Sequence, residues 1–439
     1  MSSVPPKKAD YSSAIMISSD LIWEVLVHLP TRSLMRFKCV SKLWYSIIRN
    51  PKFTTAHGSD GGGGSGRLLI TDMLFNFCLR SSPSPLQPRF MHANLNNYSC
   101  PILMHLHLTI RQQHCCHVTR VVKGLIGLYD FDINVLKLCN IATHELIKLP
   151  GSPSPQYFKK KCKTVTLVGS SDPSPQDLGI RCMYGYFLGF DPVKEVYKVL
   201  CLSRWRNHTY GELNMHVFCL GVHNSDNEWR TITPPPANLV WFYQQCLCIN
   251  GALYFLREKG WNQQTLAIFH LNTETFEKIA IPGSTNGEYD LVEICASPAL
   301  VHIDSTTEYA QVVHVWTMNR HCLGGWSSKR VLLPSGFNYP AASFRYSGTL
   351  PTGEMMLAPN KDTSLNVFRK RILNHFPFPI YVYDHHKNEM KTIIIQGYGS
   401  QDIHMDSPEN RMDFYEIHIC YYQENIISLD CFMKTISSN

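Results

Sequence analysis

Most of this 439-residue sequence consists of short apolar segments separated by turn residues. Segments such as GLIGLYDF, YFLGF, VYKVLCL, HVFCLGV, ALYFLR, LAIFHL and IYVYDH are rich in β-branched and aromatic residues, and Gly, Pro, Asn, Asp and Ser lie between them. Such side chains pack well on a pleated sheet, and frequent turn residues end each run. The pattern predicts a mostly β chain of many short antiparallel strands.

Four stretches share one arrangement, a strand, a polar turn and a second strand. They are LCNIATHELIKLP, GFDPVKEVYKVLCL, FHLNTETFEKIAIP and VYDHHKNEMKTIIIQ. Similar hairpins repeated every roughly 30 to 70 residues favour a β-propeller, in which each blade buries its faces against its neighbours. The uneven spacing leaves a two-layer β-sandwich as the alternative fold.

The N-terminal residues show a helical period instead. The apolar positions of a first helix are spaced i, i+3, i+4 and i+7: Ile22, Val25, Leu26 and Leu29. Ser19 or Asp20 is available as its N-cap, and Pro30 ends it. We expect these apolar residues to form one stripe on one face of the helix.

Two more helices are predicted after the first. Thr31 can cap the second, and Ser41 can open the third, which Pro51 ends. About forty residues cannot bury so many large apolar side chains, because units of that size usually need staples or a partner. Some of this surface is therefore expected to bind another protein.

The net charge of +7 is concentrated at this end of the chain. Residues 1–57 hold eight Lys and Arg and three Asp and Glu, which gives +5, so the remaining chain is nearly neutral. A nucleic-acid binder would be expected to carry a basic stripe across its body. The distribution favours an acidic protein partner for the helical part and predicts no nucleic-acid partner.

The run LPTRSLMRFKCVSKLWYSIIRNPKF resembles the F-box, the module that attaches many ubiquitin-ligase receptors to a Skp-family adaptor and, through it, to a cullin. The family usually has a proline just before the first helix, where this sequence has Ile17 and Ser18. The resemblance implies an adaptor-binding face that is formed or supported by Ile17, Leu21, Val25, Leu29, Pro30, Leu34, Val40 and Trp44. The alternative is a helical bundle that only packs against the rest of its own chain.

The β region resembles the kelch-like, F-box-associated domain of plant F-box proteins. The matching stretches are VKGLIGLYDF, LCNIATHELIKLP, YGYFLGFDPVKEVYKVL, EWRTI, CINGALYFLR and LAIFHLNTETFEKIAIP, which span residues 119–282, with weaker similarity to residue 397. Residues 67–118 show no motif. The predicted organisation is a disordered tail (1–15), a three-helix F-box (16–57), a Gly-rich linker (58–66) and a kelch-like β-propeller domain (67–439).

No catalytic, metal or cofactor site is predicted. The glycines at 61, 63 and 66 fit GxGxxG, but a helical module precedes them and a strand follows, the reverse of a dinucleotide site. In QQHCCH, neighbouring strand residues point to opposite faces, so only His114 with Cys116, or Cys115 with His117, could share a metal ion. The sixteen cysteines are interpreted as reduced thiols, DHHKNE as a solvated hairpin turn, and the SPSP stretches at Ser82 and Ser152 as stiff loops.

Together the resemblances imply the non-catalytic receptor subunit of a Skp–cullin–F-box ubiquitin ligase, with an unidentified target protein bound by the β domain. No signal peptide and no membrane span is recognised, so we expect the chain in the cytoplasm, the nucleus or both. Target-binding candidates are the aromatic residues of long connections between strands: Trp205, Trp241, Trp261 and Trp326. The alternatives are a propeller enzyme or a lectin-like binding module with an unrelated helical cap.

Overall fold

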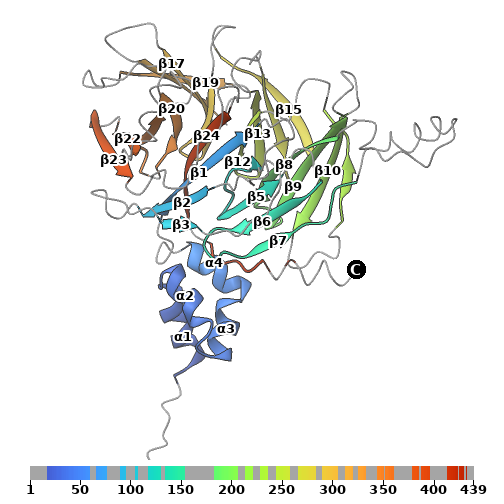
Figure 1. Ribbon diagram of the computed structural model, residues 1–439, viewed down its shortest axis with the longest axis vertical. Helices are drawn as coiled ribbons and strands as arrows, with labels where there is room; N and C mark the ends of the chain where they lie inside the picture. Colours follow the sequence, from blue (N-terminus) through green and yellow to red (C-terminus); the bar gives the residue numbers. More distant parts are fainter. Residues whose placement is uncertain are drawn as a thin grey trace, which may run out of the picture.

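The computed structural model describes residues 17–59, 66–76, 89–94, 104–106, 117–129, 134–153, 182–205, 213–220, 228–235, 244–257, 265–282, 289–304, 312–319, 325–332, 344–350, 352–359, 378–384, 387–395, 413–423, 425–429 and 432. A small helical module projects from one side of a larger β domain (Figure 1). No helix among these residues is long and apolar enough to cross a membrane.

Four helices form the N-terminal module: α1 (Ser19–Val27), α2 (Thr31–Phe37), α3 (Lys42–Ile48) and α4 (Pro51–Ser59). The prediction of three helices was one short, because Pro51 begins α4 rather than only ending α3. Proline suits the first position of a helix, where an N–H group would have no intrahelical partner. Helix α4 and strand β1, which begins at Gly66, extend into both ends of the stretch predicted as a Gly-rich linker.

The helix starts differ in part from the predicted caps. Ser18 caps α1, because its Oγ accepts the Leu21 N–H at 3.3 Å, whereas Ser19 and Asp20 lie inside the first turn. Pro30 occupies the N-cap of α2 without a side-chain bond. Ser41 caps α3 as predicted, and its Oγ accepts the Trp44 N–H at 3.1 Å. Where a serine directly precedes the helix, local hydrogen bonding fixes the start.

The helical module has its own apolar core. Its buried members are Ile22, Leu26, Val27, Leu34, Ile47, Ile48, Phe53 and, from the far end of the chain, Ile426. Val25, which the helical period placed on one stripe with Ile22 and Leu26, is 60% exposed, whereas those two residues are buried. The buried His57 donates from Nε2 to the Leu29 carbonyl at 2.9 Å, so α4 supports the corner between α1 and α2.

The β domain consists of six four-stranded antiparallel sheets among the described residues. Blade 1 holds β24 (Asp413–Gln423), β1 (Gly66–Asn76), β2 (Arg89–Asn94) and β3 (Met104–Leu106). Blade 2 holds β4 (His117–Val118), β5 (Leu125–Tyr129), β6 (Leu136–Asn140) and β7 (Leu146–Lys148). Blade 3 holds β8 (Cys182–Asp191), β9 (Val196–Trp205), β10 (Asn214–Leu220) and β11 (Arg230–Ile232).

The remaining blades follow in sequence. Blade 4 holds β12 (Gln244–Ile249), β13 (Ala252–Arg257), β14 (Thr265–His270) and β15 (Thr275–Ala280). Blade 5 holds β16 (Asp290–Ile294), β17 (Ser297–Asp304), β18 (Val312–Asn319) and β19 (Gly325–Leu332). Blade 6 holds β20 (Phe344–Thr349), β21 (Met355–Pro359), β22 (Phe378–Asp384) and β23 (Glu389–Ile395).

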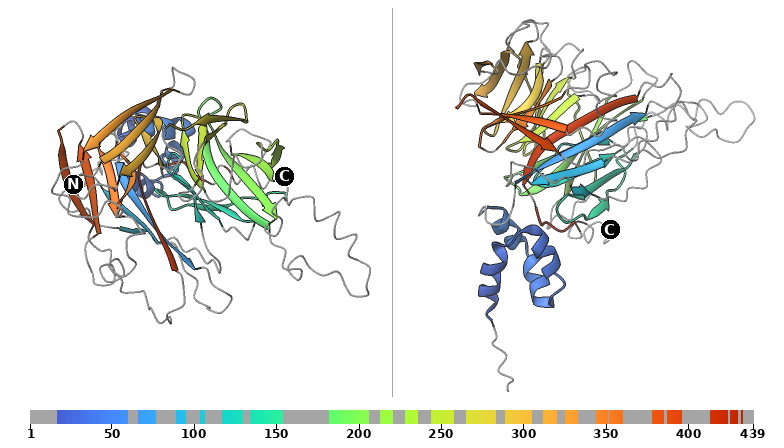
Figure 2. Two further views of the ribbon diagram at one scale, coloured as in Figure 1. Left: turned by 90° about the horizontal axis from the view of Figure 1, so that it is seen from above. Right: turned by 60° about the vertical axis from the view of Figure 1, so that its left-hand side comes forward.

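Successive blades contact each other through β5 and β8, β8 and β12, β12 and β16, β16 and β20, and β20 and β24. The sheets surround a common centre, with the helices on one side (Figure 2). This arrangement is a β-propeller, so the predicted propeller is confirmed and the β-sandwich alternative is wrong. In the stretch 67–118, where the sequence shows no motif, the structure describes strands β1, β2 and β3 of blade 1 and β4 of blade 2.

The last strand closes the ring. β24 pairs antiparallel with β1 from Gly66 opposite Gln423 to Asn76 opposite Asp413, an uninterrupted register. Blade 1 is therefore built from both ends of the domain, which ties the first strand of the ring to the last.

The four repeated stretches are hairpins, as predicted, with one shared turn. They form β6–β7, β8–β9, β14–β15 and β22–β23. In each turn the residue four positions after the end of the first strand has positive φ: His144, Glu195, Glu274 and Asn388. Asp191 and Asp384 each accept backbone N–H groups of their own turn, as does Asn140. Short polar side chains stabilise such turns locally, which explains why the repeat is visible in the sequence.

The apolar cores lie mainly between blades. One cluster joins blades 2 and 3 through residues such as Leu138, Tyr186 and Phe218, and it also includes Leu429 and Phe432 from the end of the chain. Another joins blades 4 and 5 and includes Ile268 and Leu300. Among the described residues, such cores join blades 2 to 6 in succession, so these blades form one packed body.

Candidate functional site

Among the described residues, the largest group of exposed apolar side chains lies on the helical module. Outside it, the described exposed large apolar residues are Leu146, Val193 and Leu332. On the helices and their connections they are Ile17, Leu21, Val25, Val40, Leu43 and Tyr45, each between 42% and 60% exposed. Single exposed apolar residues are ordinary, but a gathering on one small module marks an interaction surface.

Helix α1 carries the first part of this surface. Ile17, Leu21 and Val25 follow each other at intervals of four residues, which places them along one face of the helix and its N-terminal extension. The buried Ile22 and Leu26 lie on a different face and pack in the helical core. The exposed row is hence an apolar stripe that the module itself leaves uncovered.

The second part lies around the connection between α2 and α3. Val40 precedes the cap residue Ser41, and Leu43 and Tyr45 are exposed on α3, whose Ile47 and Ile48 are buried. The Arg49 guanidinium lies 5.2 Å from the centre of the Tyr45 ring and donates to its hydroxyl oxygen. Leu43 and Tyr45 were not among the predicted adaptor-binding residues, because their exposure depends on which side of α3 faces the core.

The structure divides the eight residues expected at the adaptor face into two groups. Ile17, Leu21, Val25, Pro30 and Val40 are exposed. Leu34 is buried in the helical core, with an exposed fraction of 0%, so it can support the adaptor face but cannot contact a partner directly. Leu29 and Trp44 are half-buried, and Trp44 packs edge-on against Phe37 with ring centres 5.0 Å apart.

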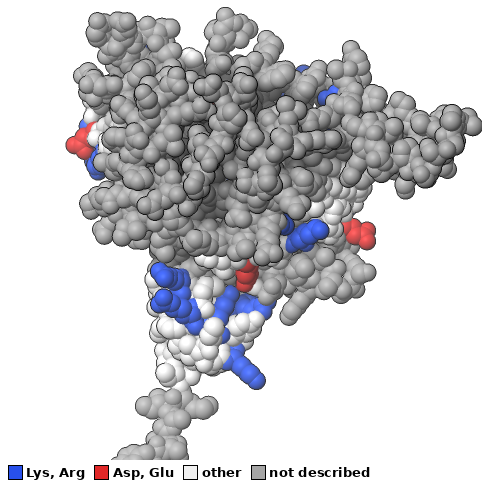
Figure 3. Space-filling model, viewed as in Figure 1, with Lys and Arg blue, Asp and Glu red and all other residues white. Residues whose placement is uncertain are grey.

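The charge around this surface is mostly positive. Arg32, Arg36, Lys42 and Lys52 are exposed on the helices, while Asp20 and Glu24 are the acidic residues of the module in its described part. Figure 3 shows Lys and Arg side chains gathered over the helical part on the face in view. The surface can thus offer apolar contacts with basic groups around them to an acidic partner.

Of the four predicted target-binding tryptophans, Trp205 and Trp326 lie in described strands. Trp326 lies on β19 rather than in a loop, is half-buried against the core between blades 4 and 5, and donates from Nε1 to the Ala280 carbonyl at 3.0 Å. It therefore fills a gap between blades, as aromatic residues with a polar edge often do. Trp205 ends β9, whereas Trp241 and Trp261 lie outside the described residues.

Strand directions nevertheless show from which side of the propeller each connection that holds these residues leaves. Within an antiparallel blade, the connections after strands two and four leave from one side of the propeller, and those after strands one and three leave from the other. The connections after β9, β11 and β13 share the side opposite the β6–β7 turn, and the connection after β18 lies on the side of that turn. Three of the four predicted target-binding connections therefore leave from one side.

The described residues provide little for catalysis or metal binding. No group of three or more His, Cys, Asp and Glu side chains in this part of the chain could hold a metal ion. His117, on β4, packs near the ring of Tyr129. His114, Cys115 and Cys116 lie outside the described residues. Seven cysteines in the described ranges are free thiols, and burial raises the pKa of Cys139 to about 12 and that of Cys248 to about 11. Such thiols remain protonated at neutral pH.

Comparison with known families agrees with the two-part structure. The F-box domain family matches residues 16–55, and the F-box associated beta propeller domain family matches residues 73–420. The second match covers most of the chain, including blades 2 to 6 and part of blade 1. This protein belongs to the F-box-associated β-propeller family.

Relatives of this F-box protein occur in Arabidopsis thaliana. An F-box/kelch-repeat protein is 26% identical over 87% of this chain and 85% of its own length, and an F-box protein is 26% identical over 87% and 86%. A putative F-box protein is 24% identical over 95% of both chains. The chain is thus a plant-type F-box protein. A chain from a nidogen/laminin complex matches with 10% identity over 74% of this chain and 93% of its own, at a TM-score of 0.35, which supports no conclusion.

Proposed function

We propose that this F-box protein is the target-recognition subunit of a Skp–cullin–F-box ubiquitin ligase. The observation that carries the proposal is the exposed stripe of Ile17, Leu21 and Val25 along α1 and its N-terminal extension, together with the exposed Val40 and Leu43 of the same module. These residues lie within a module that matches the F-box domain family, and the exposed basic groups around them suit an acidic adaptor. The stripe is the proposed binding site for a Skp-family adaptor, which links the chain to a cullin.

In this role the chain contributes proximity and no bond chemistry. The adaptor holds the F-box, the propeller holds the target, and a partner enzyme transfers ubiquitin. Holding a target next to that enzyme raises its effective concentration, and this accelerates transfer without any catalytic residue in the receptor. The proposed place of action is the cytoplasm, the nucleus or both.

Replacement of the stripe tests the adaptor site. We expect Leu21→Asp and Val25→Asp each to lower the affinity for a recombinant Skp-family adaptor about 10- to 100-fold, because central apolar anchors dominate interface energy and a buried unpaired carboxylate is costly. Affinity is measured by titration calorimetry on the full chain. Both side chains are exposed in the free protein, so circular dichroism should show an unchanged fold.

The matched control is Leu332→Asp, an equally exposed apolar residue on β19 of the propeller. This variant should bind the adaptor with the affinity of the original chain. Equal adaptor affinity of Leu21→Asp, Val25→Asp and the control would refute the proposed adaptor site.

The target site is tested with a chain that cannot deliver its target for degradation. We expect proximity labelling with the Leu21→Asp/Val25→Asp chain to enrich a reproducible set of proteins in plant cells. Replacing residues 206–212 or 258–264, which connect strands on the side opposite the β6–β7 turn, should remove members of that set. Replacing residues 320–324, on the other side, is the control. An unchanged set after all three replacements would contradict recognition by this side of the propeller.

A further inference from the structure

The end of the chain completes the core of the F-box. Ile426 has an exposed fraction of 1% and packs in the same apolar cluster as Ile22, Leu26 and Phe53. It follows directly after β24, the strand that closes the propeller. A residue covalently anchored to the ring thus lies inside the helical module.

The residues around Ile426 bind the propeller. Leu429 and Phe432 are buried in the cluster between blades 2 and 3, and the Phe432 ring lies 6.2 Å from the ring of Tyr197. The Asn140 side chain on β6 donates from Nδ2 to the carbonyls of Asn425, at 2.9 Å, and of Ile427, at 2.8 Å. Apolar burial and backbone recognition together hold this segment in one conformation.

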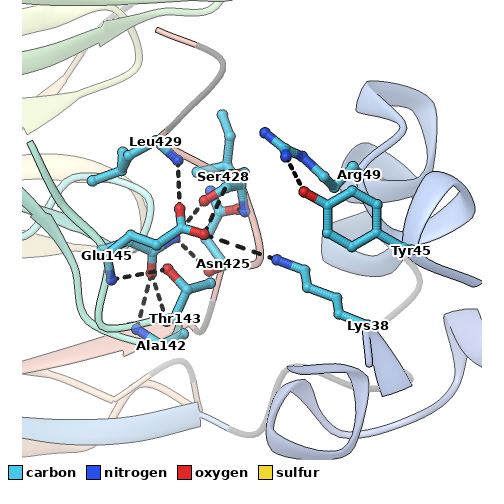
Figure 4. A network of polar contacts seen from close by, with 11 residues as sticks. Lys38, Tyr45, Arg49, Ala142, Thr143, Glu145, Asn425, Ser428 and Leu429 are labelled. Carbon is cyan, nitrogen blue, oxygen red and sulfur yellow. Dashed lines mark hydrogen bonds and ion pairs between the residues drawn. The ribbon is translucent and has the colours of Figure 1, made fainter. Parts of the chain in front are cut away.

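Glu145, in the β6–β7 turn, lies where blade 2, the C-terminal segment and the F-box meet (Figure 4). Its carboxylate accepts the Leu429 N–H at 2.6 Å and the Ser428 hydroxyl at 3.3 Å. The Nζ of Lys38, at the end of α2, lies 4.0 Å from the same carboxylate. One side chain of blade 2 therefore contacts both the C-terminal segment and the F-box.

We propose that residues 425–429 and Phe432 form a C-terminal strap that fixes the orientation of the F-box relative to the propeller, with Glu145 as a positioning residue. A single covalent connection between the two parts would leave their relative orientation unfixed, since a body attached at one point can turn about it. The strap adds a second attachment at the helical core. This proposal rests on the proposed function for its consequence: the strap sets the direction in which a bound target faces the ubiquitin-transferring enzyme.

The direct test is a distance distribution measured by electron spin resonance on the full chain. One spin label replaces Glu24 on α1 and the other replaces Val193 on the β8–β9 turn, both exposed positions. Genetically encoded labels are needed because the chain has sixteen cysteines. We expect one narrow distribution for the original sequence and a distribution at least twice as broad for Ile426→Asp.

Glu145→Ala is the second variant, because it removes the contacts of the carboxylate without placing a charge in a core. It should broaden the distribution, whereas Glu145→Gln, which keeps an acceptor for the Leu429 N–H, should remain close to the original width. Leu332→Asp serves as the control for an exposed apolar-to-acid change away from the strap. A narrow distribution in both Ile426→Asp and Glu145→Ala would overturn the proposal.

Adaptor binding separates the failure of this proposal from the failure of the proposed function. Glu145→Ala leaves the α1 stripe intact, so its affinity for the recombinant adaptor should stay within about twofold of the original. Loss of orientation with retained adaptor binding is the expected result. Broadening in Glu145→Ala together with no adaptor binding by any variant, the original included, would retain the strap and reject the ligase assignment.

Discussion

At the scale of single residues, Lys198 is a position where a charge needs partners inside the protein, because its side chain is 1% exposed. Its Nζ lies 3.0 Å from Glu274 Oε1 and 3.4 Å from Asp191 Oδ2, and it donates to the Leu271 carbonyl. Burial alone would raise the pKa of Glu274, but hydrogen bonds from Arg230 and Lys198 outweigh burial and lower it. A buried charge is tolerated only with such partners, so this group links the turns of blades 3 and 4.

Lys198→Met is expected to destabilise the protein by about 3–5 kcal/mol, the usual cost of removing one partner from a buried ion pair. The reason is that Asp191, also fully buried, loses its cation. Urea unfolding of the full chain, followed by tryptophan fluorescence, measures the change. Lys194→Met, an exposed lysine of the same turn, should change the free energy of unfolding by less than about 0.5 kcal/mol. Equal effects of the two substitutions would contradict the role of Lys198.

At the scale of elements, tight turns fix the hairpins of the propeller. Asn250 and Gly251 connect β12 to β13 with φ of 46° and 80°, the positive values of a two-residue hairpin turn. A Cβ at Gly251 would also lie 2.7 Å from Cδ of Pro192, which belongs to the turn of the neighbouring blade. This glycine is therefore required both by the backbone of its own turn and by the packing of blades 3 and 4.

Gly251→Ala and Gly353→Ala form a matched pair that separates these two requirements. Both glycines have positive φ, but a Cβ at Gly353 would have no neighbour within 4 Å. We expect Gly353→Ala to cost about 1–2 kcal/mol from backbone strain alone, and Gly251→Ala to cost more because Pro192 must move. Thermal unfolding of both variants gives the comparison. If Gly251→Ala were no less stable than Gly353→Ala, the close contact between Gly251 and the turn of Pro192 would not be required for stability.

At the scale of the whole molecule, the propeller ring and the F-box are both completed by neighbouring segments near the C-terminus. β24 closes blade 1 against β1, and the strap that follows enters the helical core. Closure of the ring and attachment of the F-box therefore end within a few residues of each other. Two truncations can separate them.

A chain that ends at residue 424 should keep a folded propeller, because β24 remains complete. A chain that ends at residue 412 should lose cooperative unfolding of the propeller, since β1 is left without the strand that joins it to the last blade. Circular dichroism and urea titrations measure both outcomes. A cooperative, native-like transition in the shorter chain would show that closure by β24 is dispensable.

Local sequence determined much of this architecture. The Ser41 cap, the four repeated hairpins and the short strands are visible because neighbouring residues decide them, through side-chain bonds to nearby N–H groups and through turn geometry. The F-box and the associated propeller domain are visible for a similar reason, since their motifs occupy continuous stretches. Even the missed α4 is local: Pro51 fits both the end of one helix and the start of another.

Tertiary structure alone decided which side chains are covered. Val25 and Leu26 are adjacent and equally apolar, yet one is exposed and the other buried, because helix packing selects the face. Trp326 fills a gap between blades although its sequence context resembles a binding loop. Ile426 and Glu145 show the limit most clearly. Their partners lie hundreds of residues away, and no local pattern encodes a contact that exists only after the ring has closed and brought the chain's two ends together.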